Sequence, residues 1–522
     1  MTRAEASLAH LYKVFTKPEG NDSRLLQIEQ HLSDNLADFL SRHVVASNTS
    51  LEDIEHHFDD AALPEHPQFV SEHAEHLLEK LVSNSVNTYS PRFIGHMTSA
   101  LPYFHLSLAK LLVGLNQNLV KIETSKAFTP LERQVLGMMH QLVYEQNDEF
   151  YAQYLHSARH SLGAFCSGGT IANISALWVA RNTLLKADTE FRGVQRDGLA
   201  AGLQHYGYKK LAVLTSQRGH YSLRKAMDVL GLGREQLIAL PCPDQTLDAE
   251  AVRQKGRELQ EQGIKVMAIV GIAGTTETGH VDPLAELAEV ATELHCHFHV
   301  DAAWGGATLF SRNHAHLLNG IKLADSVTLD AHKQMYVPMG AGMVVFKDPQ
   351  ASNAVRHHAQ YILREGSKDL GATSLEGSRN GMAMMLYASL HIFGREGYQL
   401  LIDQSIDKAR RFAVMIEDHP DFELTTSPHL CLLTYRIRPA AFQSPDNEKL
   451  DMLNKAVQKQ QREAGNSFVS RTRLETKDYP ETPITVFRVV LANPLTTDED
   501  LHAILDEQAQ LARAHKIWTE LS

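Results

Sequence analysis

The feature that most constrains the fold is a series of seven short apolar runs between residues 161 and 346, separated by amphipathic segments with helical spacing. Short strands that alternate with helices are typical of a mainly parallel β-sheet covered by helices on both faces. We therefore predict an α/β fold with seven strands. The expected strands are Leu162–Cys166, Leu211–Thr215, Leu237–Leu240, Val266–Ala273, Cys296–Val300, Ser326–Leu329 and Met343–Phe346.

Polar segments follow several of these strands, and ligands of such sheets bind beyond the carboxyl ends of the strands. The first segment is Ser167-Gly-Gly-Thr170, between an expected strand and an expected helix. Its glycine pair would let backbone N–H groups face a phosphate at the positive end of the helix, and Thr170 could add a hydroxyl. The spacing matches neither the P-loop nor the dinucleotide fingerprint, so no nucleotide site is predicted.

Three further residues would suit a flat, charged cofactor with an aldehyde group, although a lysine that reaches out to solvent and a structural histidine are the alternatives. Lys333 stands at a polar elbow between two apolar runs, where lost hydration would lower its amine pKa and make it nucleophilic toward aldehydes. Asp301 follows a buried strand, a costly place unless the carboxylate meets a cation such as a protonated pyridine nitrogen. His220 also follows a strand, and its ring could stack on a flat cofactor.

Histidines 295, 297 and 299 alternate along the chain, so a metal site has to be weighed. Alternation on a strand would give a line of ligands, and no acidic or thiol partner stands at ligand spacing. We predict no metal site.

The composition favours a soluble cytoplasmic enzyme. The net charge of −12 leaves no basic surplus to neutralise phosphates, which argues against a nucleic-acid binder. The cysteines, at positions 166, 242, 296 and 431, are far apart and form no CxxC pair, as expected of a reduced compartment. No signal peptide and no apolar run of membrane-spanning length is found.

We expect three units: a helical segment at 1–89, a large domain at 90–355 and a small α+β domain at 356–522. In the first unit, Ser23 is the expected cap of a helix whose apolar stripe would bury itself on a partner subunit. Thr129 should cap another helix, which runs to about Tyr144. The last unit should contain strands at Leu430–Arg436 and Thr485–Leu491 and a capping box at Thr497–Asp500.

In this order, these motifs resemble those of the group II pyridoxal-phosphate-dependent amino-acid decarboxylases. The matching segments are Ser167–Thr170, His220–Ser222, Gly274–Thr276, His299–Trp304, Asp325–Thr328, His332–Lys333 and Phe487–Pro494. The resemblance covers the chain from about residue 86 to the end. It implies the type I fold of pyridoxal-phosphate-dependent transferases, pyridoxal 5′-phosphate as cofactor, and a homodimer with its active site at the subunit interface.

The resemblance also implies a role for individual residues. Lys333 would bond to the cofactor aldehyde, Asp301 would pair with the pyridinium nitrogen, and His220 would stack over the ring. The other cofactor contacts would be Ser167, Gly169, Thr170 and His332 at the phosphate end, Thr275 or Thr276 near the ring, and Ala303. The substrate would meet Arg488, the family's carboxylate-binding arginine, with Arg379 as a second candidate, and His96 and Thr98; Arg92 is a further donor nearby.

The implied reaction is α-decarboxylation of an acidic amino acid, aspartate to β-alanine, with glutamate to GABA as the alternative. Animal-type glutamate decarboxylases carry glutamine where this chain has His96. Several relatives carry a loop tyrosine that Leu363–Leu375 lacks, which leaves Lys333 and His220 as alternative proton donors. A lyase of another class, such as a desulfurase, would need a loop cysteine that 356–380 does not contain. A cofactor-binding regulator is disfavoured by the acidic charge.

Overall fold

A seven-stranded sheet forms the centre of the molecule, in a computed structural model that describes residues 24–42, 44–242, 244–357, 366–442 and 446–521. All seven predicted runs form its strands, in the order β1-β7-β6-β5-β4-β2-β3. Only β7 runs antiparallel to its neighbours, β1 and β6, so the predicted mainly parallel α/β sheet is confirmed. The strands are β1 Gly163–Cys166, β2 Lys210–Ser216, β3 Leu237–Leu240, β4 Ile264–Ile272, β5 His297–Asp301, β6 Ser326–Asp330 and β7 Gly342–Phe346.

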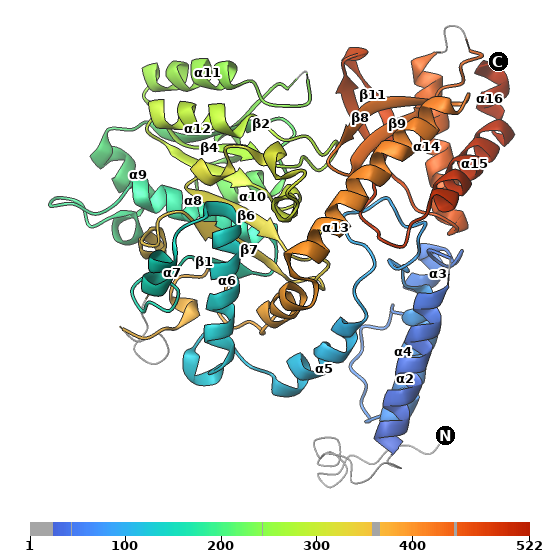
Figure 1. Ribbon diagram of the computed structural model, residues 1–522, viewed down its shortest axis with the longest axis horizontal. Helices are drawn as coiled ribbons and strands as arrows, with labels where there is room; N and C mark the ends of the chain where they lie inside the picture. Colours follow the sequence, from blue (N-terminus) through green and yellow to red (C-terminus); the bar gives the residue numbers. More distant parts are fainter. Residues whose placement is uncertain (1–23, 43, 243, 358–365, 443–445, 522) are drawn as a thin grey trace.

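Helices cover both faces of this sheet (Figure 1). Successive residues of a strand point to opposite faces, and β2 shows the result: Leu211 and Val213 join one apolar cluster, Ala212 and Leu214 another. The first cluster includes residues of α8 and α10, and the second includes residues of α6, α11 and α12. The helices of this part are α6 Phe128–Tyr144, α7 Asp148–Tyr154, α8 Gly169–Leu184, α9 Val194–Tyr206, α10 Ser222–Val229, α11 Ala249–Glu261 and α12 Leu284–Glu293.

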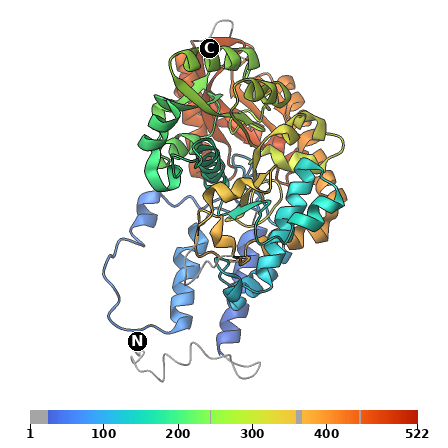
Figure 2. The ribbon, with the colours of Figure 1, turned by 90° about the vertical axis from the view of Figure 1, so that its left-hand side faces the viewer.

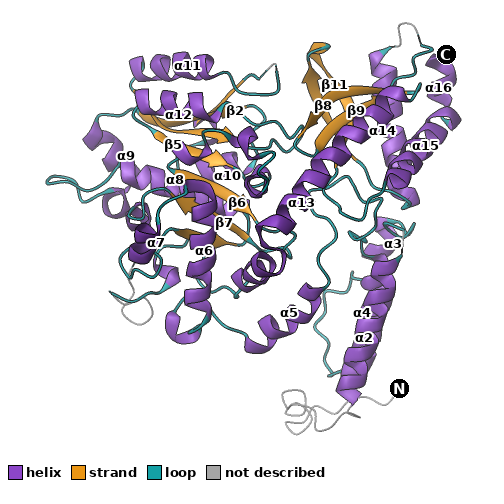
Figure 3. Ribbon diagram, in the orientation of Figure 1, coloured by secondary structure: helices purple, strands orange, loops and turns teal. Residues whose placement is uncertain are grey.

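A second, antiparallel sheet lies beside the first, and Figure 3 shows the two as separate layers of strands. Its order is β10-β11-β9-β8, with β8 Phe422–His429, β9 Leu432–Ile437, β10 Ser470–Thr476 and β11 Tyr479–Val490. The predicted strands correspond to β9 and β11, whereas β8 and β10 were not predicted. The helices here are α13 Ala383–Asp418, α14 Asn447–Ala464, α15 Asp498–Ala514 and α16 Lys516–Leu521. The predicted capping box of Thr497 and Asp500 opens α15.

The N-terminal helices project away from the two sheets (Figures 1 and 2). They are α2 Arg24–Ser41, α3 Leu51–Glu55, α4 Val70–Lys80 and α5 Phe104–Leu115, and α2 packs on α4. The apolar stripe predicted for the first helical segment includes Ile28, Leu32, Leu36 and Phe39, which lie on α2. All four are only half-buried. The predicted cap Ser23 lies outside the described residues. The division of the chain at 89 and 355 stays a prediction.

The expected cap at Thr129 is wrong. Helix α6 begins one residue earlier, at Phe128, with Ala127 at its N-cap. Thr129 lies inside the first turn, where its Oγ1 is 2.7 Å from Ser125 Oγ. Within the described ranges, no helix is both long and apolar enough to cross a membrane.

Candidate active site

A cavity of about 340 Å³ lies at the carboxyl ends of the parallel strands. Every polar segment that the sequence places at a strand end contributes to its wall. The lining includes Ser167–Thr170, Asn173, Arg218, His220, Gly274, Thr276, Asp301, Ala303, Asp330, His332 and Lys333. Residues up to 172 positions apart in the chain, from Ser167 to Met339, therefore surround one space, as expected for a ligand site in a sheet of this type.

The glycine turn packs against the segment that carries Lys333. A Cβ atom on Gly169 would lie 2.8 Å from Asp330 Oδ2, and one on Gly168 would lie 3.3 Å from His332 Cε1. Only a residue without a side chain lets the turn approach so closely. Helix α8 starts at Gly169 and thus presents its positive N-terminal end to the cavity, which suits a phosphate group.

Lys333 is held by a carboxylate that the sequence did not single out. Its Nζ lies 3.2 Å from Asp330 Oδ2, which is also 3.5 Å from His332 Nε2. The Lys333 side chain is 20% exposed, so it is largely, though not fully, withdrawn from solvent. The other oxygen of Asp330 is buried and has no hydrogen-bond partner among the described residues. Asp330 ends β6 just as Asp301 ends β5, and that shared position was the available signal.

Asp301 and His220 lie at the two ends of one hydrogen-bond network, which runs through Asn173 and Ser222. Asp301 Oδ2 accepts from Asn173 Nδ2 at 2.8 Å, and its Oδ1 accepts from the backbone N–H of Ala303 at 3.2 Å. His220 Nδ1 lies 2.9 Å from Ser222 Oγ. Burial lowers the pKa of His220, although the negative charge of Asp301 opposes this effect. His220 is therefore neutral at pH 7.

The two threonines of the loop after β4 differ in position. Thr276 lines the cavity, whereas the Thr275 hydroxyl lies 2.9 Å from Thr278 Oγ1 within its own loop and does not line it. Of these two alternative candidates for a ring contact, only Thr276 lines the cavity. Its backbone carbonyl accepts a hydrogen bond from Arg488 Nε at 2.7 Å.

Arg488 is a buried cation, and one of its terminal nitrogens makes no hydrogen bond to the described residues. Its Nη1 donates to the Gly95 carbonyl at 3.2 Å, whereas its Nη2 has no partner among the described residues. Burial lowers its pKa to about 10, so it remains charged at neutral pH. An unpaired buried guanidinium nitrogen is costly unless an anion reaches it.

His96 and Thr98 lie near this arginine. His96 Nδ1 is 2.9 Å from Thr98 Oγ1, and burial, then Arg488 and Lys333, lower the pKa of His96. Thr98 lines a second cavity of about 130 Å³, which shares His332 and Lys333 with the first. Arg92 points elsewhere, to Asp500 at 3.2 Å.

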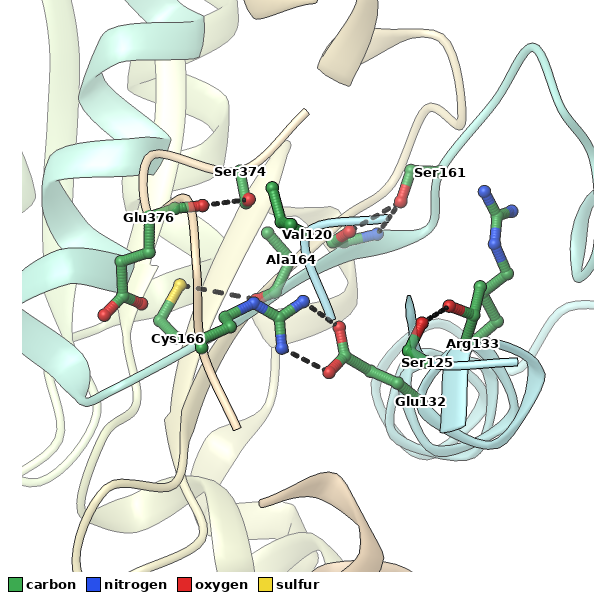
Figure 4. Close-up of polar contacts among 12 residues, drawn as sticks. Val120, Ser125, Glu132, Arg133, Ser161, Ala164, Cys166, Ser374 and Glu376 are labelled. Atoms are coloured by element: carbon green, nitrogen blue, oxygen red, sulfur yellow. Dashed lines mark hydrogen bonds and ion pairs between the residues drawn. The ribbon is translucent and has the colours of Figure 1, made fainter. Parts of the chain in front are cut away.

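The geometry does not support Arg379 as a substrate-binding residue. Both of its terminal nitrogens meet the Glu132 carboxylate, which α6 carries and whose side chain is 1% exposed. Figure 4 labels Glu132 and draws two contacts of its carboxylate as dashed lines. Arg379 lines neither cavity, and neither do Arg488 and His96, so the pairing with Glu132 is what distinguishes Arg379 from them. Because a buried carboxylate already occupies the fork of the guanidinium, it has no bidentate face left for a substrate.

Arg379→Met should therefore destabilise the fold, because it leaves Glu132 buried without a cation. We expect a loss of about 3–5 kcal/mol in the free energy of unfolding, measured by urea titration. The double change Glu132→Gln with Arg379→Met should recover part of that loss. An unchanged free energy together with a raised KM would instead assign Arg379 to the substrate site.

The three alternating histidines do not share a strand. His295 lies in the turn before β5 with φ of 48°, whereas His297 Nε2 and His299 Nδ1 both contact Ser326 Oγ, at 2.7 and 2.8 Å. Among the described residues, no three His, Cys, Asp or Glu side chains are grouped as metal ligands.

Tyr361 stands two positions before Leu363–Leu375, so the chain does carry a tyrosine next to the segment that lacks one. Residues 358–365, which include Tyr361, lie outside the described residues.

The residues around the larger cavity fit pyridoxal phosphate. The helix end at Gly169 suits the phosphate, Asp301 suits a protonated ring nitrogen, and Lys333 offers an amine to the aldehyde. All three line the same space, together with the ring of His220.

Comparison with known proteins agrees with this chemistry. The family model described as "pyridoxal-dependent decarboxylase conserved domain" matches residues 53–438. An aspartate 1-decarboxylase from Aliivibrio fischeri is 57% identical over 98% of this chain and 96% of its own length. An L-2,4-diaminobutyrate decarboxylase from Acinetobacter baumannii is 25% identical over 86% and 84%. The crystal structure of mouse CSAD superposes with a TM-score of 0.83 at 24% identity, over 95% of this chain and all of that one.

Proposed function

Because the chain belongs to the pyridoxal-dependent decarboxylase family, we propose that it removes the α-carboxyl group of L-aspartate and releases CO₂ and β-alanine. The reaction class follows from the family and from the cavity that Lys333, Asp301 and the glycine turn share. The choice of substrate is supported by the aspartate 1-decarboxylase that is 57% identical over nearly the whole length of both chains.

Cofactor binding is assigned to residues that line the larger cavity. We place the phosphate at Ser167, Gly169 and Thr170, with His332 beside them, and the ring between His220 and Ala303. Lys333 is the amine for the aldehyde, and Asp301 the partner of the ring nitrogen. When bound, pyridoxal phosphate supplies a protonated ring that accepts the electron pair left by departing CO₂.

Arg488 is the proposed anchor for a substrate carboxylate. Its unpartnered Nη2 needs an anion, and its other nitrogens are held by backbone carbonyls of Thr276 and Gly95. His96 and Thr98 would contact the same substrate from the neighbouring loop. Carboxylate binding matters to the choice of reaction, because the bond that breaks must stand perpendicular to the cofactor ring.

The carbon that loses CO₂ must receive a proton. Two residues of the cavity wall can supply it: Lys333 through Nζ, which Asp330 holds at 3.2 Å, and His220 through the ring nitrogen that does not face Ser222. We assign the transfer to Lys333, with His220 as the alternative.

A second copy of the chain is the proposed partner, as a homodimer with the active site at the subunit interface. Helix α5 exposes three apolar side chains, Leu111, Val113 and Leu115, which a partner subunit would cover. The free cysteines, three of them buried, suit the proposed cytoplasmic location.

Purified protein supplied with pyridoxal phosphate should convert aspartate with a kcat/KM about 10–100-fold above that for glutamate, since one methylene changes discrimination by about 1–3 kcal/mol. Quantifying β-alanine and GABA in parallel checks this result. 2,4-Diaminobutyrate serves as a control, because its cationic side chain should be rejected near Arg488. A preference for glutamate would replace the proposed substrate, and no product from either acid would refute an acidic substrate.

A further inference from the structure

Asn173 connects the two residues that should contact the cofactor ring. It lies in the first part of α8, is 1% exposed and lines the larger cavity. Its Nδ2 donates to Asp301 Oδ2 at 2.8 Å and to Ser222 Oγ at 3.0 Å, and its Oδ1 lies 3.0 Å from His299 Nε2. Each polar atom of the amide is therefore engaged.

The orientation of the Asn173 amide is set by the Asp301 carboxylate, which can only accept, so the amide nitrogen faces Asp301 and the amide oxygen faces His299. The His299 ring is fully buried, and burial lowers its pKa to about 4, so it is neutral at pH 7 and has one donor and one acceptor nitrogen. The Asn173 carbonyl oxygen can only accept, which assigns the proton of His299 to Nε2. Nδ1 is then an acceptor: it lies 2.8 Å from Ser326 Oγ, which can donate to it, and 3.1 Å from the Ser326 carbonyl oxygen, which cannot.

The same amide reaches His220 through Ser222. Ser222 Oγ accepts a hydrogen bond from Asn173 Nδ2 at 3.0 Å and lies 2.9 Å from His220 Nδ1, to which its own hydroxyl can donate. The backbone N–H of Ser222 also points to Nδ1, at 3.3 Å. The proton of neutral His220 is thereby assigned to Nε2, the nitrogen that does not face Ser222.

We propose that Asn173 is a positioning residue that delivers a neutral N–H donor to Asp301 and, through Ser222, helps to hold His220 with its proton on Nε2. An amide rotated by half a turn would place its carbonyl oxygen against the Asp301 carboxylate and its NH₂ group against the N–H of His299, so both neighbours favour the observed orientation. The inference rests on the proposed cofactor site but not on the proposed substrate.

Asn173→Leu, of similar volume, tests the proposal in the full chain. Asp301 would lose a donor to its charged form, so the Kd of the stripped enzyme for pyridoxal phosphate should rise about 10–100-fold, the range for a hydrogen bond to a charged group. Cofactor absorbance titration gives the Kd. Asn173→Ala should raise the Kd for pyridoxal phosphate by a similar factor. It provides a second test if the larger leucine side chain disturbs the fold.

The absorbance spectrum of the bound cofactor separates this role from simple packing. Without the Asn173 donor, Asp301 is a less well-oriented partner for a ring cation, so the visible band of Asn173→Leu saturated with pyridoxal phosphate should be displaced from that of the wild type. A variant that only packs less well should bind more weakly with an unchanged band.

Asn182→Leu is the matched control. Asn182 is on the same helix, is 4% exposed, and donates to the Ala354 carbonyl at 2.9 Å, away from the cavity. This variant should keep the wild-type Kd, and Ser222→Ala, which breaks only the branch to His220, should raise it less than Asn173→Leu. Both Asn173 variants binding within about twofold of wild type, with an unchanged visible band, would overturn the inference. Equal weakening in Asn182→Leu would overturn it too, and a wild type that binds no cofactor would refute the cofactor site itself.

Discussion

Lys333→Ala should abolish both decarboxylation and the visible absorbance of bound pyridoxal phosphate. The amine is the group in the cavity wall that can bond to an aldehyde carbon, and Asp330 holds it at 3.2 Å beside the glycine turn. Removing it takes away the covalent attachment, so activity should fall by several orders of magnitude. Absorbance after dialysis and product formation from aspartate measure the two effects.

Lys408→Met is the control for this prediction. Lys408 is also buried, and burial lowers its pKa to about 8, which makes it a reactive amine by the same reasoning. Its Nζ donates to the Asn493 carbonyl at 2.5 Å, and it does not line either cavity at Lys333. Lys408→Met should keep the absorbance. A borohydride-reducible chromophore that survives in Lys333→Ala would show that another lysine was attached.

Asp301→Asn should lower kcat by about 10²–10³-fold, a loss comparable to that of a major electrostatic contact in an active site. Asparagine has nearly the same shape and can still accept from Ala303, but its neutral amide does not keep a ring nitrogen protonated. Cofactor affinity should fall as well. The measurements are steady-state rates with aspartate and the Kd of pyridoxal phosphate.

Asp282→Asn provides the matched change outside the cavity. Asp282 is a buried carboxylate after β4 that accepts from the backbone N–H groups of Leu247 and Ile272, both at 2.8 Å. Its replacement should cost stability but leave kcat unchanged for the folded fraction. An equal loss of kcat in both variants would mean that the Asp301 effect reflects folding and not cofactor chemistry.

The sequence by itself determined the sheet and the edge at which the site lies. Seven apolar runs of strand length, with helical segments between them, leave few ways to bury their surface other than a mainly parallel sheet between two helical layers. Parallel strands bring their carboxyl ends to one edge. The polar residues that follow them, such as Asp301 and Lys333, therefore had to meet, and local patterns were enough to predict this.

Side-chain pairings between distant segments were decided only by the tertiary structure. Asn173 stands 128 positions before its partner Asp301, and Arg379 is 247 positions from Glu132, so no periodicity or spacing relates them. A sequence pattern cannot distinguish a loop arginine that faces a substrate from one that pairs with a buried glutamate. In the sequence, Asp330 is only the residue that follows a predicted strand, whereas in the fold its carboxylate lies beside Lys333. Burial decides such cases, because a buried charge or amide must find its partner in whichever part of the chain the fold places next to it.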